Sequence, residues 1–321
     1  MKIKRHDTPV KLAYQYHSAR GMAHGQVMLV AGLGLNTAFW PEALITSLNA
    51  AGFDVVAPDN RDIGRSPLLN HLGRPPLIRL AAARKLGIGL RPPYDLFMMA
   101  GDLLHLVDEL ELETFHVIGL SMGGMIAQLT ASMAPDRVRS LTSIMSTTGE
   151  AGLPRPSRDV TRLLLRKPRP DTPDGRLAHA LKMWQKISSP AYPRDDSEWL
   201  SLIMKMAGRG LDPEGIRRQL AGIIGTPGWT EELRMVIAPT LVIHGSEDPL
   251  VPLSGGEATA RAIAGARLRV FEGMGHDLPE PLLPEITAEI LRHINQAQGI
   301  RITRQSTGRP ERPIAEKNGK V

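Results

Sequence analysis

The sequence predicts an α/β fold in which a mostly parallel central sheet is flanked by helices and carries an inserted all-helical segment. Two observations predict this class. Between residues 26 and 146, apolar runs typical of buried strands alternate with helix-forming segments, and this order favours a parallel sheet with helices on both faces. The alternation stops at about Gly149 and resumes at Thr240, with helical patches but no convincing strand between them.

Composition limits the kind of protein this is. The 321 residues suffice for one large α/β domain with an insertion, or for two ordinary domains. The absence of cysteine rules out disulfides, thiol nucleophiles and thiolate metal sites, and it fits a reducing compartment. The N-terminus is charged, and no apolar run reaches the roughly 18 residues that a membrane span needs. We therefore expect a soluble, cytoplasmic protein without a membrane span.

The positive charge is concentrated at the end of the chain. Six cations and two anions follow residue 300, so this stretch holds +4 of the net charge of +6. It has no aromatic residue to stack on bases and no dense basic block. We therefore expect residues 299–321 to form a flexible basic tail, and we expect no nucleic-acid partner.

The elements before residue 149 follow one another in a regular order. Two short strands are expected as a starting hairpin, and the glycine-bearing loop at residues 32–36 separates the next strand from a helix that begins near Pro41. We expect strands at Lys2–Arg5, Val10–His17, Gln26–Ala31 and Phe53–Pro58, followed by helices at Leu77–Leu90 and Leu96–Leu110. A strand from Phe115, a helix ending near Met133 and a strand at Val138–Ser146 come next.

Charged residues in this half have simple structural interpretations. The loop at residues 59–66 is dense in charge, and we expect it to form a buried, hydrogen-bonded turn in which a carboxylate pairs with Arg61, since a buried unpaired charge is costly. Asp102 and Asp108 are expected to be solvated charges on their helix. The apolar, basic segment at residues 67–93 is expected either to line the entrance of a site or to pack as a surface arm.

The inserted segment is expected to form a cap over the sheet. Residues 149–235 would be this cap, and residues 1–148 and 236–298 would be the core. Apolar side chains that face down from the cap, with Trp184 and Trp199 as candidates, would form a substrate pocket, although most of them will be the cap's own core. The expected helices are Val160–Arg166, Leu177–Lys186, Trp199–Met206 and Pro213–Ile223.

The end of the chain completes the sheet. We expect a strand at Thr240–Gly245, a capping box at Ser254–Glu257 that opens a helix through Ala264, a strand at Leu268–Phe271 and a helix at Pro284–Ile294. His244 lies inside the first of these strands, and we interpret it as structural.

The stretch Gly119-Leu120-Ser121-Met122-Gly123 fits the G-x-S-x-G nucleophile elbow, with a strand before it and a helix after it. Glycines two residues to either side of the serine give strand and helix room to cross closely. A glycine-rich turn without catalysis has the same local pattern, so the decision depends on finding a base and an acid elsewhere in the chain.

Asp248 and His276 supply these groups. Each follows a predicted parallel strand, as Ser121 does, and the carboxyl ends of parallel strands meet at one edge of the sheet. We expect the carboxylate to orient the imidazole, which takes the proton of the Ser121 hydroxyl as it attacks a carbonyl. Glu247 is the alternative acid. The backbone N–H groups of Leu33, after Gly32, and of Met122 would hold the resulting oxyanion, so no metal or cofactor is required.

At these residues the chain resembles the α/β-hydrolase-fold serine carboxylesterases with a helical cap, over residues 27–294. The stretches at residues 58–66 and 273–279 are similar to those of a bacterial subgroup that includes aclacinomycin methylesterase. The resemblance implies ester hydrolysis by Ser121, Asp248 and His276. Two departures from the wider superfamily are Ala31-Gly32 in place of His-Gly and Asp62 in place of a glycine, although the subgroup shares the second.

Several functions remain open from the sequence alone. The leading hypothesis is a serine hydrolase that cleaves a small-molecule carboxylic ester with an apolar group. A cofactor-free perhydrolase or haloperoxidase, a thioesterase and a C–C bond hydrolase share the same triad. A non-catalytic small-molecule receptor on the same fold is the alternative from a different class. The sequence specifies neither the physiological ester nor the oligomeric state.

Overall fold

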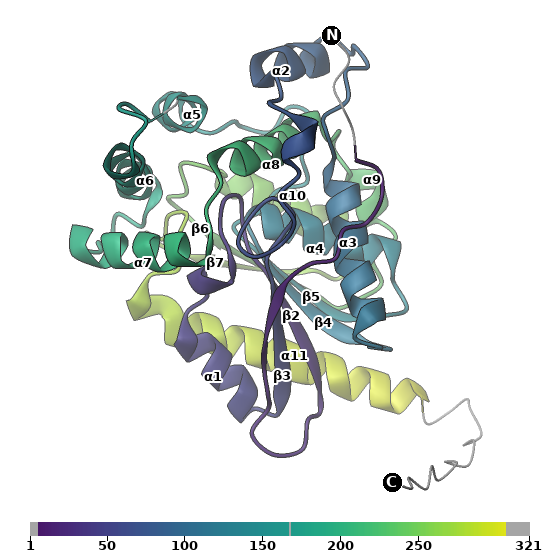
Figure 1. Ribbon diagram of the computed structural model, residues 1–321. Coiled ribbons are helices and arrows are strands. Elements are labelled where there is room, and N and C mark those ends of the chain that lie inside the picture. The colour runs from purple at the N-terminus through teal and green to yellow at the C-terminus, as the bar shows by residue number, and fades with distance from the viewer. Residues whose placement is uncertain (1–5, 167, 306–321) are drawn as a thin grey trace, which may run out of the picture.

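The computed structural model describes residues 6–166 and 168–305 (Figure 1). Within these residues, seven strands form one sheet in the order β1-β3-β2-β4-β5-β6-β7. Every neighbouring pair is parallel except β1 with β3, which confirms the predicted α/β class with a mostly parallel sheet. The strands are β1 (Tyr14–His17), β2 (Gly25–Val30), β3 (Phe53–Pro58), β4 (Phe115–Leu120), β5 (Val138–Ile144), β6 (Thr240–Gly245) and β7 (Arg267–Phe271).

Helices cover both faces of this sheet. One face carries α1 (Glu42–Ala50) and α11 (Leu283–Gln305), which contact each other and the strands. The other carries α3 (Leu96–Glu109), α4 (Met122–Met133) and α10 (Leu253–Ala262) (Figure 1). Each face has its own cluster of buried apolar side chains, and the inner strands β3, β4 and β6 are wholly buried, as a parallel sheet covered on both faces requires.

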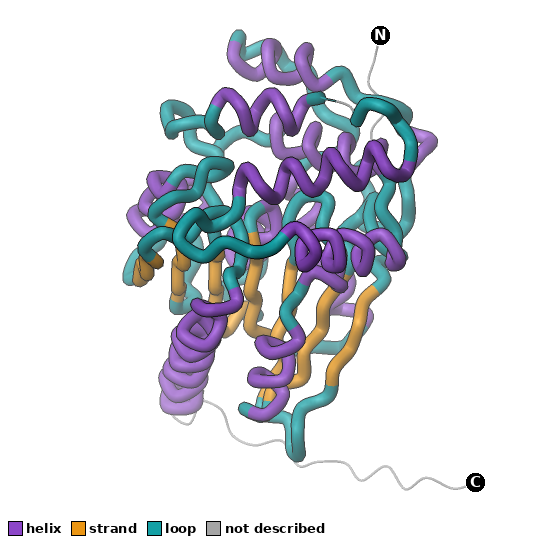
Figure 2. Tube along the Cα trace, turned by 90° about the vertical axis from the view of Figure 1, so that its left-hand side faces the viewer, coloured by secondary structure: helices purple, strands orange, loops and turns teal. Residues whose placement is uncertain are grey.

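The segment between β5 and β6 is helical, and most of it lies above one edge of the sheet (Figure 2). Its helices are α5 (Arg158–Leu165), α6 (Pro173–Ile187), α7 (Asp196–Arg209), α8 (Pro213–Gly225) and the short α9 (Thr230–Leu233). Capping side chains explain where three of them begin: Ser157, Thr172 and Asp212 each accept a hydrogen bond from an amide three residues on. We propose residues 149–235 as a cap on a core formed by residues 1–148 and 236–298.

Two expectations at the ends of the chain need correction. β1 begins at Tyr14 rather than at Val10, and it pairs with β3 instead of forming a hairpin with Lys2–Arg5, which lies outside the described residues. Val10 is buried against the side of the molecule that carries α3. At the other end, α11 continues to Gln305, so the beginning of the expected tail is helical; the tail from residue 306 onward lies outside the described residues.

Two helix predictions also differ from the structure. The helix α2 spans Leu77–Lys85 and stops before Gly87, whose positive φ of 66° favours glycine and ends the helix short of Leu90. Helix α10 begins at Leu253, after Pro252, and no side chain caps it. The predicted capping box is therefore wrong: Ser254 lies inside the first turn, where its hydroxyl makes no hydrogen bond to a described residue.

The prediction that Asp102 is a solvated helix charge is also wrong. Its side chain is buried, and both oxygens accept hydrogen bonds from Arg61, at 2.6 Å each. Burial raises the pKa of Asp102, and the Arg61 guanidinium opposes that rise. The pair is the buried ion pair expected for Arg61, with the carboxylate supplied by α3. Asp108 is exposed and pairs with Arg137, as a surface charge would.

Candidate active site

Ser121 occupies a strained turn between β4 and α4. Its φ of 56° lies in the left-handed region that side chains rarely adopt. The crossing of strand and helix is too close for side chains, because a Cβ on Gly119 would lie 2.1 Å from the Gly123 carbonyl oxygen and a Cβ on Gly123 2.0 Å from that of Val30. The turn is fixed to the sheet by the Ser121 amide, which donates to the Ile144 carbonyl at 2.8 Å.

The structure brings Ser121, His276 and Asp248 together at the ends of three strands. The Ser121 hydroxyl lies 2.9 Å from Nε2 of His276. Nδ1 of the same imidazole lies 2.6 Å from Oδ2 of Asp248. With a proton on Nδ1, the ring donates to the carboxylate and accepts from the serine hydroxyl, which is the arrangement needed to remove the serine proton.

Asp248, rather than Glu247, is the carboxylate that faces the imidazole. The Leu250 and Val251 amides donate to its Oδ1 at 2.9 and 2.8 Å, which directs Oδ2 toward His276. Glu247 is exposed to solvent. His244 is buried within β6, where Nε2 donates to the Val251 carbonyl at 2.8 Å, and burial lowers its pKa. The structural interpretation of His244 therefore fits its surroundings.

The residues predicted to hold an oxyanion lie beside Ser121. A Cβ on Gly32 would approach the Ser121 Cβ to 3.2 Å, so the loop after β2 passes directly against the elbow. Met122 is the first residue of α4, at the positive end of the helix. Within the described chain, neither its amide nor that of Leu33 donates to a backbone carbonyl in a turn or loop. The two amides therefore remain candidates for holding an oxyanion.

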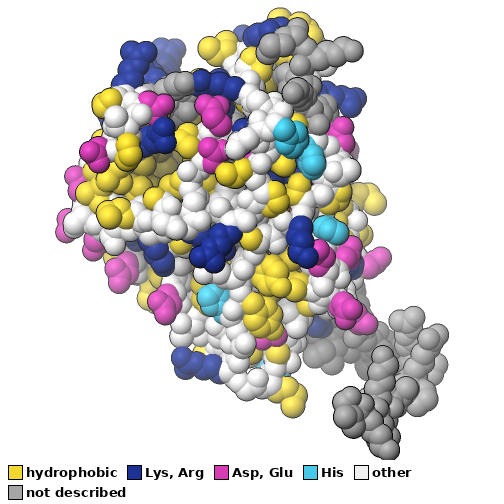
Figure 3. All heavy atoms as spheres, viewed as in Figure 1, with side chains coloured by type: hydrophobic (Ala, Val, Ile, Leu, Met, Phe, Trp, Pro, Cys, Tyr) yellow, Lys and Arg dark blue, Asp and Glu magenta, His cyan; other side chains and the backbone are white. Residues whose placement is uncertain are grey.

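A cavity of about 530 Å³ opens onto Ser121 and His276. Apolar side chains form most of its wall, leucine being the commonest residue, and Trp184 contributes from α6. Figure 3 shows the hollow as an apolar recess with charged side chains around it. The lining includes four arginines and two acids near the cap: Arg74, Arg166, Arg176, Arg217, Asp171 and Glu214. Its size and lining suit a ligand with an apolar body.

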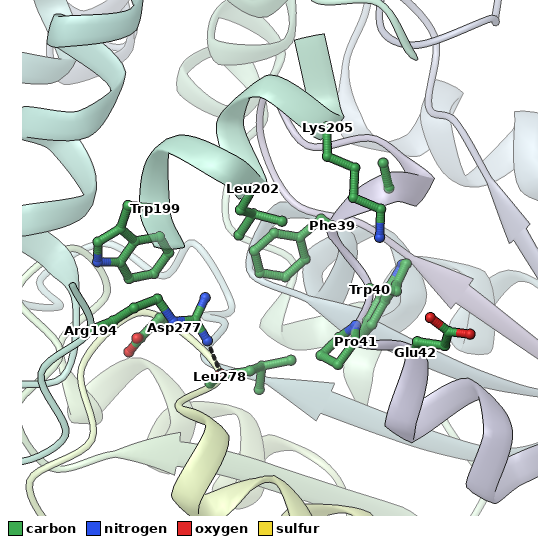
Figure 4. Close-up of a pocket in the computed structure, with 11 residues that line it drawn as sticks. Phe39, Trp40, Pro41, Glu42, Arg194, Trp199, Leu202, Lys205, Asp277 and Leu278 are labelled. Carbon is green, nitrogen blue, oxygen red and sulfur yellow. Dashed lines mark hydrogen bonds between the residues drawn. The ribbon is translucent and has the colours of Figure 1, made fainter. Parts of the chain in front are cut away.

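Trp199 does not line this cavity, contrary to the prediction for it. It stacks on Trp184 with ring centroids 4.6 Å apart and faces a separate cavity of about 150 Å³. Figure 4 shows that smaller space, with Trp199 and Arg194 on one side and Trp40 on the other. The Arg194 guanidinium lies 4.5 Å from the Trp199 ring centroid. Trp199 therefore supports Trp184 from behind.

Comparison with known proteins identifies the family. Residues 26–280 match the family model for the alpha/beta hydrolase fold, which is well over half of the chain. The chain belongs to the α/β-hydrolase-fold family. The chain is similar to rhodomycin D methylesterase DauP of Streptomyces sp. (strain C5), at 28% identity over 86% of this chain and 92% of that protein. These matches confirm the predicted resemblance to α/β-hydrolase-fold carboxylesterases and support an ester-hydrolysing enzyme.

Solved structures agree on the fold. The thermophilic esterase from Thermogutta terrifontis has a TM-score of 0.66 and 25% identity, covering 93% of this chain and 98% of that one. The enol-lactonase from Burkholderia xenovorans LB400 has a TM-score of 0.67 and 22% identity, covering 88% and 96% of the two chains. The second likeness concerns the fold alone.

In this hydrolase, the loop that carries His276 is attached to the cap. The His276 amide donates to the Ile187 carbonyl at 2.6 Å, at the end of α6. The Ser189 hydroxyl donates to the Asp277 carboxylate and accepts from the Gly275 amide. Burial raises the pKa of Asp277, and the hydrogen bonds from Ser189 oppose that rise. Sequence reasoning missed Ser189 and Asp277 as partners, because no local pattern links residues so far apart.

A second attachment joins the cap to the charged loop after β3. Arg209, at the end of α7, donates from Nε to both oxygens of Asp59, at 3.0 and 2.8 Å. Arg218 of α8 donates to both oxygens of Asp62, at 2.9 and 2.7 Å. The φ of Asp62 is 70°, a conformation that favours the glycine usual at this position. The Asp62 carboxylate therefore forms an ion pair with Arg218 of the cap, which a glycine at this position could not do.

The polar side chains of the site can be compared with what a metal ion would need. Among the described residues, no group of three or more His, Asp or Glu side chains is placed to hold a metal ion. The polar atoms around Ser121 and His276 are instead arranged for proton transfer, because each nitrogen of the imidazole has a single oxygen partner.

Proposed function

We propose that the protein is a serine carboxylesterase that hydrolyses esters with an apolar acyl group through an acyl-enzyme. The observation that carries the proposal is the hydrogen-bonded series from Ser121 through His276 to Asp248, at 2.9 and 2.6 Å, open to an apolar cavity. A binding protein has no need for this series at three separate strand ends. The methylesterase relatives add support, because their names describe cleavage of a carboxylic ester.

The first half of the reaction forms the acyl-enzyme. The Ser121 oxygen attacks the ester carbonyl carbon while its proton passes to Nε2 of His276. The carbonyl electrons move to the oxygen, where the amides of Leu33 and Met122 donate to the developing negative charge. Asp248 stabilises the imidazolium. The intermediate then collapses, and the departing alkoxide takes the proton from Nε2 and leaves as an alcohol.

The second half releases the acid. Nε2 of His276 removes a proton from water, whose oxygen attacks the acyl carbon. The same two amides hold the second oxyanion. When this intermediate collapses, the Ser121 oxygen leaves the acyl carbon and regains its proton from the imidazolium, so that the enzyme is restored. All of the required groups are present in the chain.

The cavity supports esters with an apolar acyl part over small polar ones. Leu120, Ile187 and Leu250 lie in its wall together with Ser121 and His276, and Trp184 extends the apolar surface. An apolar acyl group that enters loses its contact with water, which favours binding roughly in proportion to the apolar area buried. Methyl esters of apolar acids are therefore the first substrates to test, and the names of the relatives point to the same class.

Ser121→Ala tests the proposal directly. Wild type is expected to hydrolyse p-nitrophenyl butyrate and apolar methyl esters, and the variant to lose roughly 10⁴-fold or more in kcat, since removal of the nucleophile disables the triad as a unit. A fluorophosphonate probe should label wild type at Ser121 and leave the variant unlabelled. Equal turnover by both proteins would exclude the serine mechanism. Tight ligand binding by wild type without turnover would favour a receptor.

A further inference from the structure

The segment at residues 67–93, called the arm here, differs in charge from the rest of the described chain. It contains five cations, Arg74, Arg79, Arg84, Lys85 and Arg91, and no aspartate or glutamate. Its helix, α2, lies at the end of the molecule opposite α11 (Figure 1). Arg74 pairs with Glu214 of α8 at 3.6 Å, and the remaining positive charge of the arm attracts an anionic surface. The proposed esterase chemistry gives it no role.

The arm is attached to the cap by one face only. Leu77, Leu80 and Ala83 of α2 are buried, and the two leucines belong to an apolar cluster with Leu220 and Ala221 of α8. Arg84 donates to three backbone carbonyls of neighbouring segments, at Ile223, Ile224 and Gly149. Its guanidinium therefore fixes the arm in place. The inner face and Arg84 account for the fold of the arm but not for its outer surface.

The outer surface combines large apolar side chains with cations. Ile78, Leu86 and Ile88 are 80%, 70% and 59% exposed, which is unusual for side chains of this size and kind. Arg79, Lys85 and Arg91 are exposed beside them, and within the described residues none of the three cations forms an ion pair with a carboxylate. Apolar groups among unpaired cations are typical of segments that lie in the interface of an anionic membrane.

The arm also forms part of the wall of the cavity that contains Ser121. Arg74 and Leu77 belong both to the arm and to the lining of the cavity that contains Ser121. Residues of the same α8 helix, Ile216 and Leu220, line the cavity beneath it. A surface that contacted Ile78, Leu86 and Ile88 would therefore lie against a helix whose neighbouring residue Leu77 lines an apolar cavity. None of the helices in the described chain is both long and apolar enough to cross a bilayer, so contact would be peripheral.

We propose that the arm docks this protein on the surface of an anionic phospholipid bilayer, with Ile78, Leu86 and Ile88 inserted among the acyl chains and Arg79, Lys85 and Arg91 near the lipid phosphates. Charge complementarity selects this partner, because the arm has cations alone and the leaflet supplies anions. An apolar ester dissolved in the bilayer would then reach the cavity without crossing water. Only this last step depends on the proposed esterase function.

Vesicle sedimentation tests the docking without any chemistry. The full chain carrying Ser121→Ala is mixed with vesicles of phosphatidylcholine alone or of equal parts phosphatidylcholine and phosphatidylglycerol. Binding is expected with the anionic vesicles and to weaken as salt rises. Adding Ile78→Asn, Leu86→Asn and Ile88→Asn should weaken binding roughly tenfold or more, because three inserted side chains are lost. Arg79→Gln with Lys85→Gln and Arg91→Gln should weaken it to a similar extent.

The matched control removes exposed apolar groups elsewhere. Met235 and Ile237 are 64% and 65% exposed, and they precede β6, whereas Asp248 follows it, so they lie toward the opposite edge of the sheet. Met235→Asn with Ile237→Asn should leave vesicle binding unchanged. All variants keep the basic C-terminal residues. Equal binding by the arm variant and this control would therefore overturn the proposal and assign binding to another part of the chain.

Two further readouts complete the test. With Ser121 restored, the arm variant should hydrolyse a soluble p-nitrophenyl ester as wild type does but should be slower toward the same class of ester held in anionic vesicles. Light scattering after gel filtration reports self-association. If wild type does not sediment with anionic vesicles, the arm is not a membrane-docking surface. The same conclusion follows if wild type is a dimer in solution and the arm variant is a monomer. If wild type does not hydrolyse the soluble p-nitrophenyl ester, that result contradicts the esterase proposal but not the docking proposal.

Discussion

The proposed triad and the loop containing Asp59 and Asp62 are both buried groups of polar and charged side chains, but they differ in what their polar atoms face. Both oxygens of Asp62 are occupied by Arg218, and Asp59 is similarly held by Arg209. Ser121 and His276, by contrast, have one partner for each atom that we propose takes part in the reaction, and they lie on the wall of the cavity. The first group joins cap to core, and the second remains available to a substrate.

This difference shows how buried charge can serve attachment or chemistry. A saturated ion pair resists change, because removing one partner leaves the other charge buried and uncompensated. A catalytic series must instead pass a proton and return it. Substitutions in the two groups should therefore have different effects. Those in the triad should reduce turnover with little effect on folding. Those in the loop containing Asp59 and Asp62, called the joint here, should reduce the free energy of unfolding.

Asp248→Asn should have the largest effect in this comparison. The amide cannot stabilise the imidazolium and favours the wrong tautomer of His276, so we expect kcat to fall by roughly 10⁴-fold, whereas the urea midpoint changes little. Steady-state kinetics on a p-nitrophenyl ester measure the effect. Glu247→Gln is the matched control, because the neighbouring acid is exposed and should be dispensable. A greater loss from the control would assign the acid to Glu247.

Asp62→Asn should act on stability. The change removes the nearer carboxylate from buried Arg218 and leaves only Asp212, at 3.3 Å. Breaking a buried pair typically costs about 3–5 kcal/mol, and the remaining carboxylate places the expected loss toward the lower end. Urea unfolding followed by circular dichroism gives the free energy of unfolding. Glu231→Gln, which breaks the exposed pair with Arg234, should cost far less. Similar losses in the two variants would mean that the joint contributes little to holding cap and core together.

His293 extends the comparison to a buried imidazole without a carboxylate. Its Nε2 lies 3.1 Å from the Leu141 carbonyl, and burial lowers its pKa from 6.5 to about 4. Because the folded pKa lies below the unfolded value, unfolding takes up a proton in acid. Stability is therefore retained above pH 6.5 and lost as pH falls toward about 4.

The expected loss at pH 5, relative to neutral pH, is about 2 kcal/mol from this residue. Urea unfolding at a series of pH values measures it, and His293→Gln should have a shallower acid dependence than wild type between those limits. His244 is buried with a lowered pKa as well, so some dependence should persist in the variant. Parallel profiles for wild type and His293→Gln would contradict the assignment.

Ser189→Ala should have the smallest effect of these substitutions, and that effect should be on kcat. Its hydroxyl connects Asp277 to the Gly275 amide on either side of His276, so its loss should let the imidazole move relative to Ser121. We expect kcat to fall by about tenfold while KM stays close to that of wild type, since misplacement of a catalytic group slows the chemical step. Ser189→Thr should recover most of the rate. Ser188→Ala is the control.

If Ser189→Ala lowers the melting temperature and leaves kcat unchanged, Ser189 is merely part of the attachment between cap and core. The loop that carries His276 would then behave like the Asp59–Asp62 joint, and the distinction drawn between the two regions would hold for the three triad residues alone.

The order of the strands and helices from residue 25 onward, and the positions of Ser121, Asp248 and His276 at strand ends, could be predicted from the amino-acid sequence. Strand and helix periodicity are local properties, and a parallel sheet brings the carboxyl ends of its strands to one edge whatever the details of packing. The glycines at 119 and 123 were informative for the same reason, because the clearance they provide is needed within a single turn.

Tertiary structure alone decided which polar groups became buried and what they contact. Asp102 looked like a helix surface charge until α3 packed it against Arg61, 41 residues earlier. Ser189 and Asp277 are 88 residues apart, and they are in contact only because the cap packs against the loop that carries His276. Trp184 and Trp199 both lie in predicted helices of the cap, yet of the two only Trp184 lines the cavity that contains Ser121. Burial and partner depend on segments distant in the chain, and local periodicity carries no information about them.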